Sequence, residues 1–215
     1  MKVAMLHAFP LDERMWDAQR DFLAGYDVIT PNLYDLGGNS VEGWAQVVLD
    51  QVDDDNLVAV GASLGGYVAL AMARSAPEQV RGLLLAGSRA GADPPERRAA
   101  RDEQIRTLHE QGIEAWAPSA PAPPPPERTI EVLVRSLEAL RDRPDATDVA
   151  RTFDGPLWIA VGEKDPFLPL EEAREIVANA RNGRLEVFED TGHFPNLERP
   201  ERFNQLLQEL LTAVA

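Results

Sequence analysis

The chain has 215 residues, of which 44% are hydrophobic, so it is long enough to form one domain with a sizeable core. It contains no cysteine, which excludes disulfides, thiolate metal sites and a cysteine nucleophile. Its formal net charge of −15 at pH 7 disfavours binding to nucleic acid or to an anionic membrane, because like charges repel. With three histidines and no cysteine, we also expect no metal site.

Short apolar segments alternate with helical patterns along the first part of the chain. Asp12 and Ser40 stand where helices begin, and their side chains suit the N-cap position. Strands are predicted over 2–7, 26–30, 57–60 and 80–86, and helices over 12–24, 40–52 and 67–74. This alternation indicates βαβ units, and therefore a parallel sheet covered by helices on both faces.

The pattern changes after residue 92, where no further strand is predicted until residue 156. A charged helix opens at Pro94-Pro95, and a second helix is predicted over 127–141. The prolines of 117–126 favour an extended polyproline geometry, which would serve as a stiff linker or as a docking segment for a partner. The predicted division is a core of residues 1–92 and 153–215 with a helical cap inserted at 93–152.

The strand and helix alternation resumes in the last third of the chain. Strands are predicted over 156–161 and 184–188, and helices over 170–180 and 200–214. The apolar run Val3–Leu6 is too short for a signal-peptide core or a membrane span, so we expect a cytoplasmic location.

The segment Gly61-Ala62-Ser63-Leu64-Gly65-Gly66 lies between a predicted buried strand and a predicted helix. The G-x-S-x-G pattern in this context is typical of a nucleophile elbow. The serine must sit on a sharp, strained turn, and side chains two residues away on either side would collide with the neighbouring strand or helix. The start of the helix also favours negative charge that develops beside the serine.

Two other loops at the ends of predicted strands carry an acid and a histidine. Asp165 follows the strand over 156–161, and His193 follows the strand over 184–188. The carboxyl ends of parallel strands form sites at one edge of a sheet. A serine hydroxyl needs a base to become a nucleophile, and an acid can orient a histidine base. We therefore predict that Ser63, Asp165 and His193 form a catalytic triad.

Other residues compete for these roles. Glu163 and Asp190 are alternative acids, although Asp190 is only three residues before His193 and is poorly placed to orient it. His7 is an alternative base and is more simply explained as shaping the loop after the first strand. His109 lies in a charged helix and is expected at the surface.

The reaction also needs donors for an oxyanion. The backbone N–H of Leu64, directly after the predicted nucleophile, is one candidate. The second donor should come from the loop after the first strand, where Phe9 is suitably placed.

These segments resemble the α/β-hydrolase superfamily over nearly the whole chain. The residues that carry the resemblance are Leu6 to Pro10 with Trp16, Gly61 to Gly66, Gly162 to Asp165, and Gly192 to Phe194 with Glu198-Arg199-Pro200; Ser88 to Asp93 is similar to the segment that leads into the cap of small esterases and enol-lactonases. The resemblance implies an α/β-hydrolase fold with a mainly parallel sheet of six strands, a Ser63–His193–Asp165 triad and a helical lid over Ser63. Ala8 stands where the family usually has glycine.

We therefore expect a serine hydrolase that cleaves a small carboxylic ester or lactone through an acyl-enzyme, without a cofactor. Trp116, Phe167 and Phe194 are candidates for lining the substrate pocket, with core packing as the alternative for each. Members of the superfamily with the same triad include C–C bond hydrolases, cofactor-free haloperoxidases and hydroxynitrile lyases. A non-catalytic protein that binds a small molecule is a further alternative.

Overall fold

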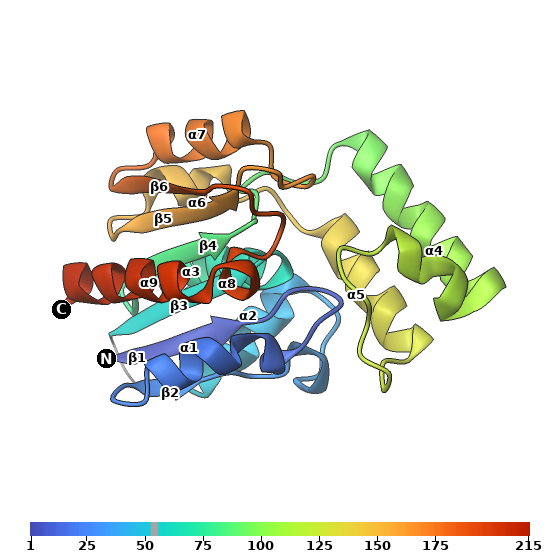
Figure 1. The fold of residues 1–215 in the computed structure, drawn as a ribbon, viewed down its shortest axis with the longest axis horizontal. Helices are drawn as coiled ribbons and strands as arrows, with labels where there is room; N and C mark the ends of the chain where they lie inside the picture. The colour runs from blue at the N-terminus through green and yellow to red at the C-terminus, as the bar shows by residue number, and fades with distance from the viewer. Residues whose placement is uncertain (53–55) are drawn as a thin grey trace.

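A single parallel sheet forms the centre of the molecule (Figure 1). The computed structural model describes residues 1–52 and 56–215, and its sheet has the strand order β2-β1-β3-β4-β5-β6. All adjacent strand pairs are parallel, which confirms the predicted six-stranded fold. The strands are β1 (Lys2–Leu6), β2 (Asp27–Ile29), β3 (Leu57–Ala62), β4 (Val80–Ala86), β5 (Leu157–Gly162) and β6 (Gly183–Phe188).

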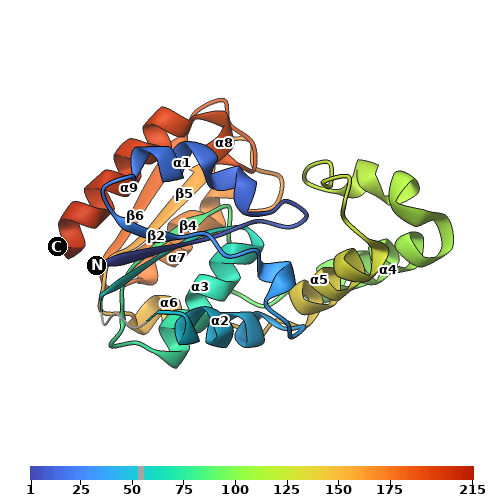
Figure 2. The same ribbon diagram turned by 90° about the horizontal axis from the view of Figure 1, so that it is seen from below.

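Helices cover both faces of the sheet, as Figure 2 shows. On one face lie η1 (Glu13–Trp16), α1 (Asp17–Phe22), α8 (Pro195–Glu198) and α9 (Pro200–Val214); on the other lie α2 (Val41–Asp50), α3 (Leu64–Ser75), α6 (Thr147–Thr152) and α7 (Leu170–Asn179). The side chains of β1 show the two layers. Ala4 and Leu6 belong to the core cluster that includes α2 and α3, whereas Val3 and Met5 belong to the cluster that includes α9. Successive strand residues point to opposite faces, so a strand buried on both faces is apolar throughout.

Both predicted N-caps are confirmed. The carboxylate of Asp12 accepts a hydrogen bond from the backbone N–H of Arg14 at 3.2 Å, and the hydroxyl of Ser40 accepts one from Gly43 at 3.1 Å. The segment after Asp12 differs in one respect from the helix expected over 12–24. It begins as the 3-10 helix η1 and continues as the short helix α1, which ends at Phe22.

The segment after β4 projects beyond the carboxyl ends of the strands (Figure 1). It consists of α4 (Pro95–Trp116), the 3-10 turn η3 (Ala117–Ser119) and α5 (Ile130–Asp142), and α4 packs against α5. The helical geometry of α4 is interrupted at Gly112, where φ is 83°. The final helix of the expected insertion, α6, instead packs against α3 and α7 of the core. We propose that α4, η3 and α5 form the cap.

Ion pairs hold the segment between η3 and α5 against the core and join the two ends of the cap. The guanidinium of Arg128 lies 4.2 Å from the ring centroid of Tyr34 and donates to the carboxylate of Asp12 at 3.2 Å. At the base of the cap, the carboxylate of Asp93 is paired with both Arg101 and Arg143. Removing one partner of such a buried pair is strongly destabilising, because it leaves the other charge uncompensated. The described part of the chain contains no helix that is both long and apolar enough to cross a membrane.

The start of α3 lies in close contact with the neighbouring strands. A Cβ atom placed on Gly65 would lie 1.9 Å from the carbonyl oxygen of Leu6 in β1. A Cβ atom on Gly61 would lie 2.3 Å from the carbonyl carbon of Gly65. These distances confirm that side chains at both positions would collide with backbone, which is the steric requirement expected from the sequence.

His7 holds the loop after β1 against the 3-10 turn η2 (Leu33–Asp35). Its Nδ1 donates to the carbonyl oxygen of Ala8 at 3.1 Å, and its Nε2 accepts from the backbone N–H of Leu33 at 2.9 Å. The ring is fully buried, and burial lowers its pKa from the ordinary value of 6.5 to about 4. Because both ring nitrogens are engaged with backbone groups, this neutral histidine is a structural connection between two loops.

The contact between Gly65 and Leu6 predicts a large effect of an added methyl group. Gly65→Ala should destabilise the fold by about 3 kcal/mol, the upper end of the usual cost of overpacking, because backbone must move to accommodate the Cβ atom. Gly25→Ala is the matched control, because a Cβ at Gly25 meets no atom within 4 Å. Urea unfolding followed by circular dichroism measures both changes. A Gly65→Ala protein as stable as the control would contradict the close packing described for α3.

The buried state of His7 predicts a pH dependence of stability. Between pH 4 and 6.5 the unfolded chain binds a proton at this residue and the folded chain does not, so acidification favours unfolding. The contribution of neutral His7 to the free energy of unfolding is complete above pH 6.5. It is lost progressively toward pH 4, by on the order of 3 kcal/mol.

This pH dependence can be tested with His7→Gln, whose side-chain oxygen can still accept from Leu33 without titrating in this range. Free energies of unfolding should be measured for both proteins at several pH values from 7 to 4. The wild type should lose more stability over this range than the variant. Parallel curves would show that His7 is not the group responsible.

Candidate active site

Ser63 occupies a strained position between β3 and α3. Its backbone has φ 47° and ψ −108°, a region that residues other than glycine rarely adopt. The end of β4 fixes this turn from two sides. The N–H of Ser63 donates to the carbonyl oxygen of Ala86 at 2.8 Å, and the hydroxyl of Ser88 donates to the carbonyl oxygen of Ser63 at 3.0 Å.

Ser88 is a supporting residue that the motif analysis did not assign to the site. It is fully buried and lies so close to Gly66 that a Cβ atom there would be 2.0 Å from its hydroxyl oxygen. A small polar residue two positions after the end of an apolar strand, together with the second glycine of Gly65-Gly66, is the sequence signal for this contact.

The loops after β5 and β6 bring Asp165 and His193 together. His193 Nδ1 lies 2.9 Å from Oδ1 and 2.8 Å from Oδ2 of Asp165, and both side chains are almost completely buried. Since a carboxylate accepts, Nδ1 donates and Nε2 is the ring nitrogen left to accept a proton. Asp165 Oδ1 also accepts from the backbone N–H groups of Phe167 at 2.7 Å and Leu168 at 3.2 Å, which fixes the carboxylate.

The two competing acids have other partners. Glu163 accepts from the backbone N–H of Asp190 at 3.1 Å, and the Asp190 carboxylate forms an exposed ion pair with Lys164 at 2.7 Å. This ion pair lowers the pKa of Asp190, chiefly through the hydrogen bond from Lys164. Of the three acids considered from the sequence, Asp165 is the one that bonds to His193.

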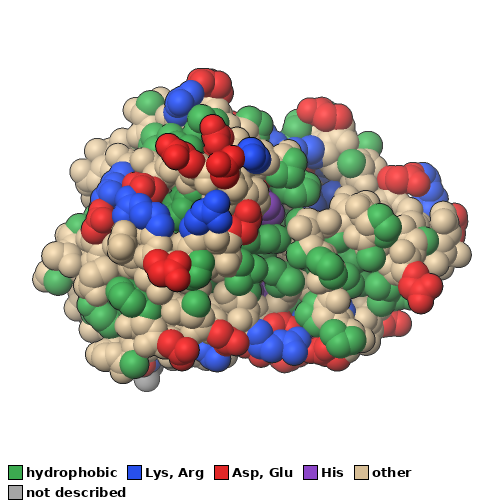
Figure 3. Space-filling model, viewed as in Figure 1, with side chains coloured by type: hydrophobic (Ala, Val, Ile, Leu, Met, Phe, Trp, Pro, Cys, Tyr) green, Lys and Arg blue, Asp and Glu red, His purple; other side chains and the backbone are tan. Residues whose placement is uncertain are grey.

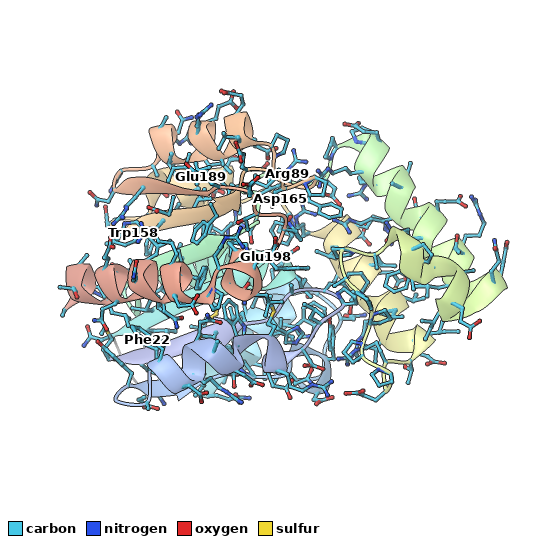
Figure 4. The ribbon with its side chains drawn as sticks, viewed as in Figure 1. Phe22, Arg89, Trp158, Asp165, Glu189 and Glu198 are labelled. Atoms are coloured by element: carbon cyan, nitrogen blue, oxygen red, sulfur yellow. The ribbon has the colours of Figure 1, made fainter. Side chains whose placement is uncertain are left out.

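Glu198 holds the loop that carries His193. Its carboxylate accepts from the backbone N–H of Gly192 at 2.8 Å and from that of Phe194 at 3.1 Å. In Figure 4, Asp165, Arg89 and Glu198 lie together at the end of the sheet that faces the cap. The segment Glu198-Arg199-Pro200 contributed to the family resemblance, but only the folded chain shows that this carboxylate bonds to the residues on either side of the histidine.

Ser63 and His193 line the same small cavity, with a volume of about 50 Å³. Phe9 lines it from the loop after β1, and Arg97 and Gln104 line it from α4. Figure 3 shows the corresponding groove between core and cap, lined mainly by hydrophobic side chains, with a histidine visible inside it. The cavity therefore lies between the predicted catalytic residues and the cap.

Two larger hollows, of about 560 and 750 Å³, lie elsewhere on the surface. The first is lined by residues such as Arg81, Phe153 and Val214, at the opposite end of the sheet from Ser63. The second lies beside α7 and includes Glu175 and Ile176. Size alone would have favoured these hollows, but the strained serine and the bonded histidine line the smaller cavity.

Of the two residues whose backbone N–H groups are predicted to receive an oxyanion, Phe9 lines this cavity and Leu64 directly follows Ser63, which also lines it. Leu64 is the first residue of α3, so its N–H has no carbonyl partner within the helix. Phe9 lines the cavity, and its ring packs against Trp116 with 5.6 Å between centroids. Among the described residues, no group of three or more His, Cys, Asp or Glu side chains is arranged to hold a metal ion.

The three aromatic residues predicted to line the pocket differ in their position relative to the cavity. Phe167 lines the cavity, and its ring centroid is 4.7 Å from that of His193. Phe194 packs against His193 at 4.8 Å without being part of the cavity lining. Trp116 is fully buried behind Phe9, so core packing describes it better than substrate contact.

Comparison with known proteins gives two esterases as similar chains. The chain is 28% identical over 254 aligned residues to a pimeloyl-[acyl-carrier protein] methyl ester esterase from Aromatoleum aromaticum, with 97% of each chain covered. A thermophilic esterase from Thermogutta terrifontis superposes with a TM-score of 0.86 at 28% identity, covering 100% of this chain and 90% of that one.

Another similar chain is a hydrolase with a different substrate. A 2-hydroxy-6-oxononadienedioate/2-hydroxy-6-oxononatrienedioate hydrolase from Paraburkholderia phymatum is 27% identical, over 86% of this chain and 70% of its own length. The model of the alpha/beta hydrolase family matches residues 3–206, which is nearly the entire chain. The protein therefore belongs to the alpha/beta hydrolase family.

Proposed function

We propose that the protein is a serine hydrolase that cleaves a small carboxylic ester or lactone. The observation that carries this proposal is the buried hydrogen bond between His193 and Asp165 beside a cavity that Ser63 also lines. The strained backbone of Ser63 supports it, because a nucleophile on a sharp turn stands clear of its own backbone. The esterases among the similar proteins support the ester as the bond that is cleaved.

In the acylation step, the hydroxyl oxygen of Ser63 forms a bond to the carbonyl carbon of the substrate. His193 takes the hydroxyl proton on Nε2, and Asp165 stabilises the resulting imidazolium through Nδ1. The carbonyl oxygen gains negative charge and is stabilised by the backbone N–H groups of Leu64 and Phe9. The tetrahedral intermediate collapses, its bond to the alkoxy oxygen breaks, and the leaving alcohol takes the proton from His193.

In the deacylation step, water replaces the alcohol. His193 removes a proton from water as the water oxygen attacks the acyl carbon. The bond from this carbon to the Ser63 oxygen then breaks, and His193 returns the proton to the serine. The products are a carboxylic acid and an alcohol, or a hydroxy acid from a lactone, so this reaction needs no cofactor.

Cleavage of a carbon–carbon bond next to a ketone is the second candidate. It is favoured by the similar proteins that hydrolyse 2-hydroxy-6-oxononadienedioate and 2-hydroxy-6-oxononatrienedioate, or 2-hydroxymuconate semialdehyde. The same serine and histidine would serve, with a carbon leaving group in place of an alkoxide. Comparing initial rates on short-chain esters, lactones and diketones distinguishes the two reactions.

Removal of the Ser63 hydroxyl should abolish the activity. Ser63→Ala should lower the rate of p-nitrophenyl acetate hydrolysis by at least about a thousandfold and should prevent labelling by a fluorophosphonate probe. Ser75→Ala, at the exposed C-terminal end of α3, is the matched control and should retain wild-type activity. A wild-type protein that neither hydrolyses the ester nor reacts with the probe would refute the serine hydrolase proposal.

Replacement of the buried acid should slow the reaction without removing the nucleophile. Asp165→Asn should lower kcat by about a thousandfold or more, because the amide no longer stabilises the imidazolium or selects the correct tautomer. Asp190→Asn changes an exposed acid that contacts Lys164, and it should stay within about twofold of the wild type. Equal losses in the two variants, measured with the same ester, would argue against the assigned role of Asp165.

A further inference from the structure

Arg97 is a cation in the cavity that lacks a carboxylate partner among the described residues. It lies in the first turn of α4, is partly buried, and lines the cavity together with Ser63 and His193. One of its terminal nitrogens donates to the backbone carbonyl oxygen of Phe167 at 2.6 Å. A guanidinium has five N–H donors, so this hydrogen bond leaves most of its donor capacity unused.

The positive charges of the arginines near Arg97 are compensated by carboxylates. Arg89 is paired with Glu172 at 2.7 Å. Arg101 and Arg143 share the buried carboxylate of Asp93. The carboxylates of Glu172 and Asp93 thus form ion pairs with three guanidiniums in total. Neither carboxylate is paired with Arg97.

The electrostatic surroundings agree with an excess of positive charge at this point. Burial lowers the pKa of Arg97, and the nearby cations Arg89 and Arg101 lower it further, whereas Tyr67 and Asp93 act in the opposite direction. The chain has 36 acidic residues against 21 lysines and arginines, so carboxylates are abundant in the protein as a whole. A partly buried cation that forms no direct ion pair is costly, and an anion that binds beside it offsets that cost.

A second donor is available in the same cavity. The side-chain oxygen of Gln104 accepts from the indole N–H of Trp116 at 3.4 Å, which assigns the NH₂ group to the remaining side of the amide. A planar guanidinium and an amide NH₂ are well suited to the oxygens of a carboxylate, and an arginine can bind both of these oxygens at once.

We propose that Arg97 binds a carboxylate of the substrate, and that the substrate class is a short ester or lactone bearing a free carboxylate, such as the half-ester of a dicarboxylic acid. This inference rests on the proposed serine hydrolase function, because it places the anionic end at Arg97 and the reacting carbonyl at Ser63. The cavity of about 50 Å³ favours a short chain between these two groups. Hydrolysis of a half-ester would release an alcohol and a dicarboxylate.

The experiment compares two esters of similar shape and different charge. Ethyl hydrogen succinate carries a carboxylate where ethyl 4-methylpentanoate carries an isopropyl group, and a pH-stat at pH 7 measures the hydrolysis of both. We expect the wild type to have a higher kcat/KM for the anionic ester. In Arg97→Gln the ratio of the two kcat/KM values should fall by about 10- to 100-fold, the loss expected for a hydrogen bond between charged groups.

Arg98→Gln is the matched control, because Arg98 is exposed on the same helix and is paired with Asp142 at 3.1 Å. The ratio of the kcat/KM values for the anionic and the neutral ester should be the same in Arg98→Gln as in the wild type. Arg97→Lys keeps the charge without the planar fork, so it should recover part of the preference for the anionic ester.

The outcomes separate this inference from the function on which it rests. If Arg97→Gln lowers both rates equally, Arg97 only supports the loop through Phe167, and carboxylate binding is refuted. A wild type that hydrolyses the neutral ester at least as well, with Ser63 labelled by a fluorophosphonate, refutes the inference and leaves the serine hydrolase intact. A wild type that is inert on both esters and unlabelled refutes both proposals together.

Discussion

The close approach of α3 to β1 is the contact on which the candidate site depends. Only a residue without a side chain fits at Gly65, where a Cβ atom would overlap the carbonyl oxygen of Leu6. This contact brings the start of the helix directly against the ends of the central strands, so that Ser63 must complete the turn with a positive φ. The strain at Ser63 is offset by hydrogen bonds to Ala86 and from Ser88. The same geometry leaves the N–H of Leu64 at the free end of a helix, where negative charge is favoured.

The remaining parts of the site come from loops that are secured independently. Asp165 is fixed by two backbone N–H groups, and the loop of His193 is fixed by the carboxylate of Glu198. The histidine thus has little freedom to turn away from the acid, because both sides of its loop are anchored. Such preorganisation is what allows hydrogen bonds to stabilise developing charge without reorganising during the reaction.

The cap gives the cavity an electrostatic character opposite to that of the whole chain. The net charge is −15, but the cap contributes Arg97 and Arg101 to the cavity, and the carboxylate of Asp93 is shared between Arg101 and Arg143. An acidic surface with a basic cavity would keep anionic macromolecules away by long-range repulsion and still accept a small anion at short range.

The sequence by itself determined the alternation of strands and helices, the helix caps at Asp12 and Ser40, and the glycine pattern around Ser63. These features depend on local periodicity and local sterics, which neighbouring residues encode. Tertiary structure alone decided the strand order, the bond between His193 and Asp165, and the packing of α6 with the core. It also decided that Trp116 packs behind Phe9 while Arg97 reaches the cavity. These arrangements join residues far apart in the chain, so they are fixed by packing and charge in the folded protein, which no local pattern of residues records.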